Sequence, residues 1–457
     1  MTEDHFIKLS EIVPSDCIVR EDTKVEKYSK DYAWFSPILK RELADKKADA
    51  VVLVPDRDAL IEIIRWCYQE TIPVTIRGGG TGNYGQCTPL FGGLLLELMQ
   101  IDRIISAADG EMTMEPGVRI FDLENEARKH GMEMRCMPST WVKSSIAGFI
   151  CGGSGGIGSI SYGGTANGGM VKQLKILTLE AKPRILSFSE DDCLPAINTY
   201  GTTGVVVELT LRMASKRQYD QHIFTHSDFD LLFKWCHKIA NDSSYPKRLV
   251  TFFEDAISAT FAPLAKQIPS DEHSAFILVD VAHSKRLIED AEHSGIKSVH
   301  FIDAIEPLRP PYITDYTWNH TMLWLYKANP DWTYSQIDYG EDALDKIHAL
   351  KKKFPEEIYT HIEWVKATSK WKGDDVVPGG GPAILYSSDE RLAEISEYAE
   401  SIGCAVTSPH VYHLEEGYFE DYRDSKMALK ELTDPAGILN PGKMSAYPKN
   451  PFVQTVS

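Results

Sequence analysis

A glycine-rich stretch with the sequence RGGGTGNYG, at residues 77–85, has the residue types to bind an anion through its backbone. Glycine lacks the Cβ atom that disfavours positive φ, so successive N–H groups can converge on a phosphate. Residues 80–85 also match the dinucleotide fingerprint G-x-G-x-x-G, which requires a helix beginning at its last glycine. Here a second apolar strand, at 94–98, follows instead. The sequence therefore predicts a phosphate-binding loop between two strands and not a Rossmann turn.

A second glycine-rich stretch runs from Ser144 to Val171 without a charged residue, and ten of its residues between Gly148 and Gly169 are glycine. The stretch is long enough to span a bilayer, but it contains too much glycine, serine, threonine and asparagine for a lipid-facing helix. Backbone that packs closely against a large flat ligand explains the composition better, because side chains would clash with such a ligand.

Four segments in order resemble those of one enzyme family. They are the loop at 77–85, the segment 138–163, the segment 200–206 (YGTTGVV) and the terminal segment 434–443 (DPAGILNPGK). Together they resemble the FAD-linked oxidoreductases of the vanillyl-alcohol oxidase/p-cresol methylhydroxylase type, and the terminal segment is most similar to the glycolate oxidase and D-lactate dehydrogenase branch. The resemblance covers residues 45–215 and 420–445 and implies bound FAD.

The resemblance implies a set of cofactor contacts. Backbone N–H groups of Gly78, Gly79, Gly80, Thr81, Gly82 and Asn83 would hold the pyrophosphate, with Arg77 and Gly85 in the same loop. The second glycine segment, entered through Pro138, Ser139 and Thr140, would line the pyrophosphate and isoalloxazine with Ser144, Ser145, Gly148, Gly152, Ser154, Gly155 and Gly158. The adenosine end would meet Gly204, Val205 and Val206, and Asn440 would lie beside the flavin ring.

The expected FAD is non-covalent. Many relatives carry a histidine at the fourth position after the loop arginine and attach the flavin to it, whereas this chain has Thr81 there. Cys87 and Cys151 are the nearest thiols, and neither occupies the position from which relatives attach flavin through cysteine.

Candidates for the substrate chemistry lie in the second half of the chain. Oxidation of a C–OH bond needs a base for the hydroxyl proton, and histidine or tyrosine suits that role. The candidates are His320, His361, His410, His413 and Tyr412, with a structural, hydrogen-bonded role as the alternative for each. Eight tyrosines and tryptophans between Tyr312 and Tyr339 form either a packed core or part of the substrate pocket.

No metal is predicted. The hydroxy-acid relatives usually carry a histidine-rich divalent-metal motif, but His361 here has no second histidine at the required spacing. The loss of that motif also weakens the case for a D-2-hydroxy-acid substrate. Arg248, Arg309 and Arg423 are candidates for a carboxylate clamp, with surface exposure as the alternative.

The strands and helices expected from the sequence, which must position these residues, indicate an α+β protein. Strands are expected at 51–54, 73–76, 94–98, 111–115, 173–179, 204–212, 275–281, 297–303 and 358–364, and helices at 56–70, 120–130, 228–241, 284–294 and 341–353. The expected domains are a two-subdomain FAD-binding part (1–215), a substrate or cap part with an antiparallel sheet covered by helices (216–419), and a returning tail (420–457). Residues 378–382 (PGGGP) are expected to form a loop.

The amino-acid composition limits the kinds of partner and the cellular location that we expect for this protein. A formal net charge of −18 disfavours nucleic acid, and eight scattered cysteines without a C-x-x-C pair indicate a reducing, cytoplasmic location. No secretion signal or membrane span is expected. The expected function is FAD-dependent oxidation of a small hydroxy acid or aromatic alcohol, with oxygen, a quinone or a redox protein as electron acceptor. A vanillyl-type phenol oxidase and an electron-transfer subunit of a larger complex are the alternatives, and a homodimer is left open.

Overall fold

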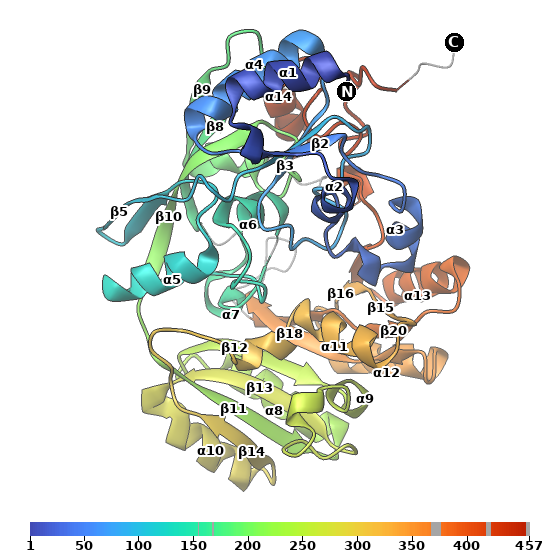
Figure 1. The fold of residues 1–457 in the computed structure, drawn as a ribbon. Coiled ribbons are helices and arrows are strands. Elements are labelled where there is room, and N and C mark those ends of the chain that lie inside the picture. The colour runs from blue at the N-terminus through green and yellow to red at the C-terminus, as the bar shows by residue number, and fades with distance from the viewer. Residues whose placement is uncertain (154, 167–168, 367–375, 417–421, 454–457) are drawn as a thin grey trace.

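The computed structural model describes residues 1–153, 155–166, 169–366, 376–416 and 422–453. Helices and strands are mixed along the chain, and the strands form four sheets (Figure 1). In these described ranges, no helix combines the length and the apolar character that crossing a membrane requires.

The first sheet has the strand order β1-β2-β4-β3. Since β3 is an edge strand, the glycine loop that follows it lies at one edge of the sheet. Its strands are β1 (Ile18–Val19), β2 (Ala50–Leu53), β3 (Val74–Arg77) and β4 (Leu94–Glu97). The amphipathic helix α4 (Arg57–Glu70), capped by the Asp56 side chain, buries Leu60, Ile63 and Ile64 against the sheet together with α1 (Glu3–Ile12). The predicted strands and helix of this part are confirmed.

The second sheet has the order β5-β6-β10-β8-β9, and β7 also pairs with β10. Its strands are β5 (Ile104–Ala108), β6 (Glu111–Met114), β7 (Met132–Met134), β8 (Val171–Leu177), β9 (Ile185–Ser189) and β10 (Val205–Ser215). Helix α5 (Ile120–Lys129) ends before Gly131, which has a φ of +71° as expected for a helix C-terminus. The second glycine segment forms two short helices, α6 (Ile146–Gly152) and α7 (Ser159–Tyr162).

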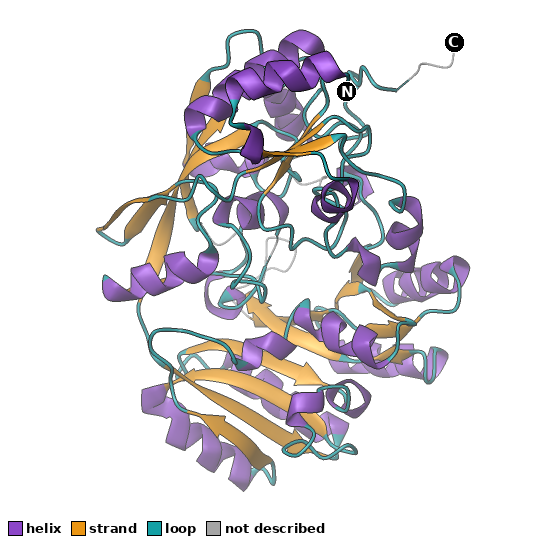
Figure 2. Ribbon diagram, viewed as in Figure 1, coloured by secondary structure: helices purple, strands orange, loops and turns teal. Residues whose placement is uncertain are grey.

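The third sheet is antiparallel, as predicted, with the order β14-β11-β13-β12-β18-β19-β16-β21. Its strands are β11 (Tyr219–His226), β12 (Lys247–Phe253), β13 (His273–Asp280), β14 (Lys297–Ile302), β16 (Gln336–Asp338), β18 (His361–Lys366), β19 (Val376–Gly380) and β21 (Ala405–Thr407). Figure 2 shows this large sheet in the lower half of the molecule with helices along its outer side.

The two faces of the third sheet belong to different cores because side chains alternate along each strand. In β13, Ile277 and Val279 pack with α8 (Phe229–Asn241), α10 (Ser284–His293), α12 (Ala343–Lys353) and α13 (Asp389–Ser401). Phe276 and Leu278 face the other way, into a core shared with Met137 and Trp141 of the first half of the chain. The sheet is therefore joined to the first half by a continuous apolar core.

A small fourth sheet lies beside the third, with the order β15-β20-β17. It consists of β15 (Trp332–Tyr334), β17 (Ile358–Tyr359) and β20 (Ala383–Leu385), next to α11 (His320–Ala328), and the short α9 (Asp255–Ser258) follows β12. The expected loop at 378–382 is wrong in part, because residues 378–380 belong to strand β19. A Cβ atom on Gly380 would lie 2.0 Å from the His361 carbonyl oxygen, so close strand contact explains the glycines.

The C-terminal segment after α14 (Arg423–Thr433) returns to the first sheet, where Figure 1 shows α14 near α1 and α4. The N–H of Val74 donates to the Ile438 carbonyl (2.8 Å), and the N–H of Asn440 donates to the Val74 carbonyl (2.6 Å). The N-terminal helices α2 (Asp22–Tyr28) and α3 (Pro37–Glu42) flank the same region.

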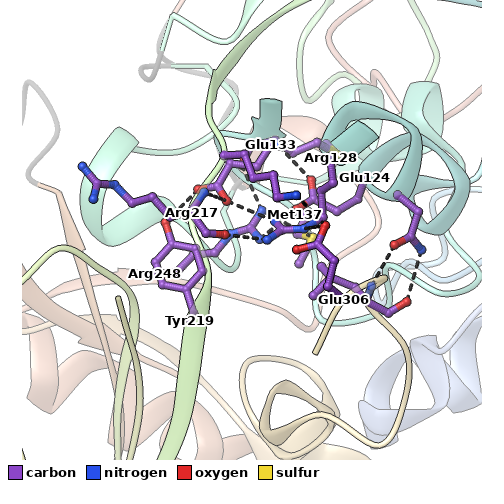
Figure 3. Close-up of polar contacts among 12 residues, drawn as sticks. Glu124, Arg128, Glu133, Met137, Arg217, Tyr219, Arg248 and Glu306 are labelled. Carbon is purple, nitrogen blue, oxygen red and sulfur yellow. Dashed lines mark hydrogen bonds and ion pairs between the residues drawn. The ribbon is translucent and has the colours of Figure 1, made fainter. Parts of the chain in front are cut away.

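A buried group of charges lies where α5 and β7 meet the third sheet (Figure 3). The Arg248 guanidinium on β12 donates to Glu124 at 2.8 Å, and Arg128 contacts both Glu124 (3.3 Å) and Glu133 (3.2 Å). Tyr219 donates its hydroxyl to Glu133 at 2.7 Å. The two Nη groups of Arg248 are thus bonded inside the protein, whereas its Nε atom is buried without a partner among the described residues.

Candidate functional site

A large hollow is lined by both the glycine loop after β3 and the second glycine segment. It encloses about 1300 Å³, including its open mouth. Many of the residues predicted to contact the cofactor line it: Arg77, Gly78, Gly79, Gly80, Thr81, Gly82, Asn83, Pro138, Thr140, Ser144, Ser145, Gly148, Gly152, Gly155, Gly204, Val205 and Val206. Segments that are far apart in the sequence are thus brought around one space, which we name the first cavity.

The glycine loop between β3 and β4 contains no helix and presents open backbone donors. Within the described part of the chain, no hydrogen bond uses the N–H groups of residues 79–83. A run of unpaired N–H groups on the wall of a cavity is a nest suited to phosphate oxygens. The residues present therefore fit the pyrophosphate of FAD.

Close packing between the two glycine segments explains the absence of side chains there. A Cβ atom on Gly78 would lie 1.9 Å from the Ser145 hydroxyl oxygen, and one on Gly79 would lie 2.2 Å from the Lys143 carbonyl oxygen. The Thr81 hydroxyl bridges the two segments by a hydrogen bond to the Ser144 hydroxyl at 2.7 Å. Any larger residue at positions 78 or 79 would push the segments apart.

The remaining predicted cofactor residues lie behind the lining. Gly85 packs near Leu43, Ser139 is buried, and the Gly158 N–H donates to the Arg248 carbonyl at 2.9 Å. Asn440, expected beside the flavin ring, donates its side-chain amide to the Gln86 and Tyr200 carbonyls (3.0 and 2.7 Å), so it fixes two segments that line the first cavity. Ser154 lies outside the described residues.

An N-terminal segment that the sequence did not indicate supports the loop, and its residue Asp31 also lines the first cavity. The buried Asp31 carboxylate accepts the Gln86 N–H at 2.9 Å, and the Tyr32 N–H donates to the Gly82 carbonyl at 2.8 Å. Lys443 donates to the Gly85 carbonyl at 2.6 Å. Burial raises the pKa of Asp31 and lowers the pKa of Lys443 to about 7. No motif marks residues 28–35, so only the folded structure reveals this support.

A second cavity adjoins the first and shares Trp318, Asn319 and Gln336 with it. Its empty volume is about 640 Å³, including the space at its opening. The other lining residues come from α11, from β15 and β16, from β18, and from the glycine-rich end of β19: Met322, Tyr334, Asp338, His361, Glu363, Val365, Gly379, Gly380 and Gly381. A molecule in the second cavity would therefore meet one held in the first.

A buried histidine–carboxylate pair forms part of the second cavity. His361 Nε2 lies 3.0 Å from Glu363 Oε1, and both side chains are almost completely buried. Glu363 also accepts the Trp318 N–H at 2.7 Å and the Thr251 hydroxyl, while the His361 ring stacks on Phe253. Since Nε2 donates to the carboxylate, Nδ1 of the imidazole remains as the acceptor.

The Trp318 backbone has a φ of +52°, which is unusual for a bulky residue. The hydrogen bond from its N–H to Glu363 holds this conformation, and its indole rests against Gly155 of the first cavity. The indole Nε1 atom is buried without a partner in the part of the chain that the structure describes. Such local strain and an unused buried donor mark a functional position.

Four of the five candidates for the base, His320, His410, His413 and Tyr412, line neither cavity. His410 has both ring nitrogens engaged, with the Ser36 hydroxyl (2.8 Å) and the Tyr334 carbonyl (2.9 Å), and burial lowers its pKa to about 4. Burial likewise lowers the pKa of His320 to about 4. Tyr412 and His413 pack on each other beside the C-terminal tail, where His413 Nδ1 donates to the Gly442 carbonyl.

Of the candidate histidines, His361 is the one that lines a cavity in the described structure, whereas its partner Glu363 was not among the candidates. Two residues apart on a predicted strand, they must point to the same face, and a histidine beside a carboxylate suits acid–base chemistry as well as metal binding. Among the described residues, no group of three or more His, Cys, Asp and Glu side chains is arranged to hold a metal ion.

Comparisons with known proteins agree with this geometry. A family model described as an FAD binding domain matches residues 48–187. The chain is 24% identical to an uncharacterized FAD-linked oxidoreductase of Mycobacterium tuberculosis, over 95% of this chain and 97% of that protein. It is 26% identical to the glycolate oxidase subunit GlcD of Bacillus subtilis, over 87% and 89%.

Two further likenesses are more limited, the first in the length that matches and the second in sequence identity. A D-2-hydroxyglutarate dehydrogenase of Xanthomonas citri is 28% identical over 47% of this chain and 45% of its own length. Alkyldihydroxyacetonephosphate synthase shares the fold, with a TM-score of 0.71 at 12% identity over 97% of this chain and 85% of that one. Fold, cavity and relatives together define an FAD-dependent enzyme. The chain thus contains an FAD-binding domain, and it resembles FAD-linked oxidoreductases, among them glycolate oxidase subunits and D-lactate dehydrogenases.

Proposed function

We propose that this enzyme oxidises a CH–OH group of a small substrate bound in the second cavity, by hydride transfer to FAD bound in the first. The observation that carries the proposal is the wall that the two cavities share, formed by Trp318, Asn319 and Gln336. In this proposal residues 1–215 form the two-subdomain FAD-binding part, residues 216–419 the substrate part, and residues 420–457 the returning tail.

His361 is the proposed base. Its Nδ1 atom takes the hydroxyl proton as the C–H bond breaks and the C=O bond forms, and the Glu363 carboxylate stabilises the imidazolium that results. When bound, FAD supplies the two-electron acceptor for the hydride. Asn319 and Gln336 offer neutral amide groups that can orient the substrate oxygen. The base proposed here thus replaces His320, His410, His413 and Tyr412.

FAD is proposed to bind without a covalent link. Thr81 occupies the position that carries histidine in many relatives, and its hydroxyl is bonded to Ser144. Cys87 and Cys151 line the first cavity, but burial raises the pKa of both thiols, that of Cys151 to about 12. A protonated thiol is a poor nucleophile. Acid precipitation should therefore leave the yellow colour in the supernatant, whereas colour in the pellet would overturn this part.

Anaerobic mixing with a series of alcohols and hydroxy acids tests the function, with loss of the flavin visible absorbance as the signal. His361→Gln should slow reduction by about 10²–10⁴-fold, the usual contribution of a general base. His348→Gln is the matched control, because His348 pairs with Asp230 on the surface in the same way. Equal rates for both variants would remove His361 from the mechanism.

The same experiment separates the alternatives. Reduction of the isolated chain by an alcohol excludes a role limited to electron transfer within a complex. Reoxidation of the reduced protein by oxygen, by a quinone or by a redox protein then identifies the acceptor. If no hydroxyl compound bleaches the flavin, the proposed function fails.

A further inference from the structure

The charges around the second cavity set a condition on its substrate. Two carboxylates line it, Glu363 in the buried wall and Asp338 in a more exposed place. Among the described lining residues there is no lysine or arginine. Lys370 and Lys372, between β18 and β19, lie outside the described residues. The polar side chains that line the second cavity in the described part of the chain are therefore neutral or negatively charged.

The first cavity does not supply the missing cation. Arg77 is the one arginine or lysine in its described lining, and its Nη1 group donates to the carbonyls of Tyr28 (2.6 Å) and Lys30 (2.8 Å) and to the Cys87 sulfur. Arg248, considered from sequence as a clamp, is buried in the network with Glu124. Neither arginine is directed at a substrate beside His361.

We propose that the second cavity selects an uncharged alcohol and rejects substrates that carry a carboxylate or phenolate next to the reacting carbon. This inference rests on the proposed function. An anion there would lose its hydration, find no lysine or arginine among the described lining residues and approach the Glu363 carboxylate. The chain would thereby differ from its relatives named for glycolate, D-lactate and D-2-hydroxyglutarate.

The uncharged groups of the cavity fit such a substrate. The Asn319 amide can exchange hydrogen bonds with hydroxyl groups, and the buried Trp318 Nε1 atom is a donor without a partner in the described chain. Met322 and Val365 offer apolar surface for the carbon skeleton. These donors and surfaces recognise a neutral oxygen on an apolar body without a compensating charge.

Gly381 limits the space beside the proposed base. A Cβ atom on Gly381 would lie 3.7 Å from His361 Nδ1 and 3.7 Å from Tyr334, an ordinary contact distance, and its φ is not positive. Gly381→Ala should therefore fold normally yet occupy room next to Nδ1. We expect a higher half-saturation concentration for every substrate, and a larger increase for branched alcohols than for unbranched ones.

The test compares pairs of substrates that differ only in the charged group: glycolate with ethane-1,2-diol, lactate with propane-1,2-diol, and mandelate with 1-phenylethane-1,2-diol. Each is mixed anaerobically with the holoenzyme, and the rate of flavin reduction is measured. At least one diol should reduce the flavin 100-fold faster or more than its acid. Val365→Arg, which adds a cation to the lining, should raise the rate with the acid of that pair relative to its diol.

The outcomes are distinct. Faster reduction by the acids overturns the charge inference but keeps the proposed function, and loss of that activity in a Lys370→Ala/Lys372→Ala variant would locate the overlooked cation. Equal rates within the pairs also overturn the inference, because the cavity would then ignore charge. No reduction by any acid or alcohol overturns the proposed function itself.

Discussion

Glu363 binds two groups whose positions both matter for the proposed reaction. One oxygen accepts the His361 Nε2–H and the Trp318 N–H, and the other accepts the Thr251 hydroxyl. The carboxylate thus fixes the base on β18 and the strained residue between the cavities. A single side chain on a rigid strand can therefore hold the proposed base in a fixed position relative to the wall that the two cavities share.

The first prediction concerns this carboxylate. Glu363→Gln keeps the shape and an oxygen that accepts the Trp318 N–H, but it removes the charge that stabilises the imidazolium. The limiting rate of flavin reduction should fall on the order of 10²-fold, with a half-saturation concentration close to that of the wild type. Stopped-flow absorbance over a range of substrate concentrations measures both. A higher half-saturation concentration with an unchanged limiting rate would assign Glu363 to binding alone.

Lys443 should make FAD binding depend on pH. Burial lowers its pKa to about 7, although Asp31 and Cys87 oppose this shift, and the Tyr412 ring covers its Nζ atom. Below pH 7 the ammonium is charged with or without FAD. Above pH 7 the free protein has lost the proton, whereas the pyrophosphate anion favours the charged form, so binding must take a proton up. The affinity for FAD should therefore fall as the pH rises from 7 to 9, by at most about tenfold per pH unit.

Titration of the apoprotein with FAD, followed by flavin fluorescence at several pH values, measures this dependence. Lys443→Met should bind FAD more weakly and lose the fall above pH 7. Lys449→Met, an exposed lysine in the same tail, is the control and should behave as the wild type. A wild-type dissociation constant that stays flat from pH 7 to 9 contradicts the prediction.

At the scale of elements, the glycines of β19 show where sequence patterns stop. A PGGGP run is typical of a loop, yet Gly379 and Gly380 pair with β16 and β18. These positions must lack a side chain because residues far along the chain lie too close. A Cβ atom on Gly379 would lie 2.4 Å from the Asp338 carboxylate. No local rule contains such a contact.

Gly380→Ala and Gly381→Ala test this explanation. The Cβ atom at 380 would lie 2.0 Å from the His361 carbonyl oxygen and must push β18 and β19 apart, whereas the Cβ atom at 381 meets nothing nearer than 3.7 Å. Gly380→Ala should cost about 1–3 kcal/mol of stability, as overpacking usually does, and Gly381→Ala less than that. Thermal unfolding followed by circular dichroism compares the two, and equal melting temperatures would refute the packing argument.

Other elements could be predicted because local signals agreed. The loop after β3 has glycines, a preceding apolar strand and a following one, and α4 has an N-cap aspartate and an apolar stripe. The second cavity could not be predicted in this way. Its wall combines Trp318, Gln336, His361 and Gly381 from separate elements, and their approach depends on tertiary packing alone.

The whole molecule depends on a contact between its two halves that is partly apolar and partly ionic. The core that contains Trp141 and Phe276 holds the third sheet against the first half, and the charged network of Figure 3 lies at the same junction. Because the second cavity is built on this sheet and the first on the glycine segments, the junction sets the alignment of substrate and cofactor.

The network should therefore be essential to stability even though it is expensive to bury. Arg128 and Arg248 balance Glu124 and Glu133, and all four side chains are almost completely buried. Arg248→Met removes one cation and leaves Glu124 with Arg128 as its sole described ionic partner, which should lower the free energy of unfolding by about 3–5 kcal/mol. Urea unfolding followed by circular dichroism measures this loss. Arg41→Met breaks an exposed pair with Asp389 and should cost about 0–1 kcal/mol. If the two variants unfold at the same urea concentration, the buried charges contribute no more than surface ones, and the apolar core alone joins the halves.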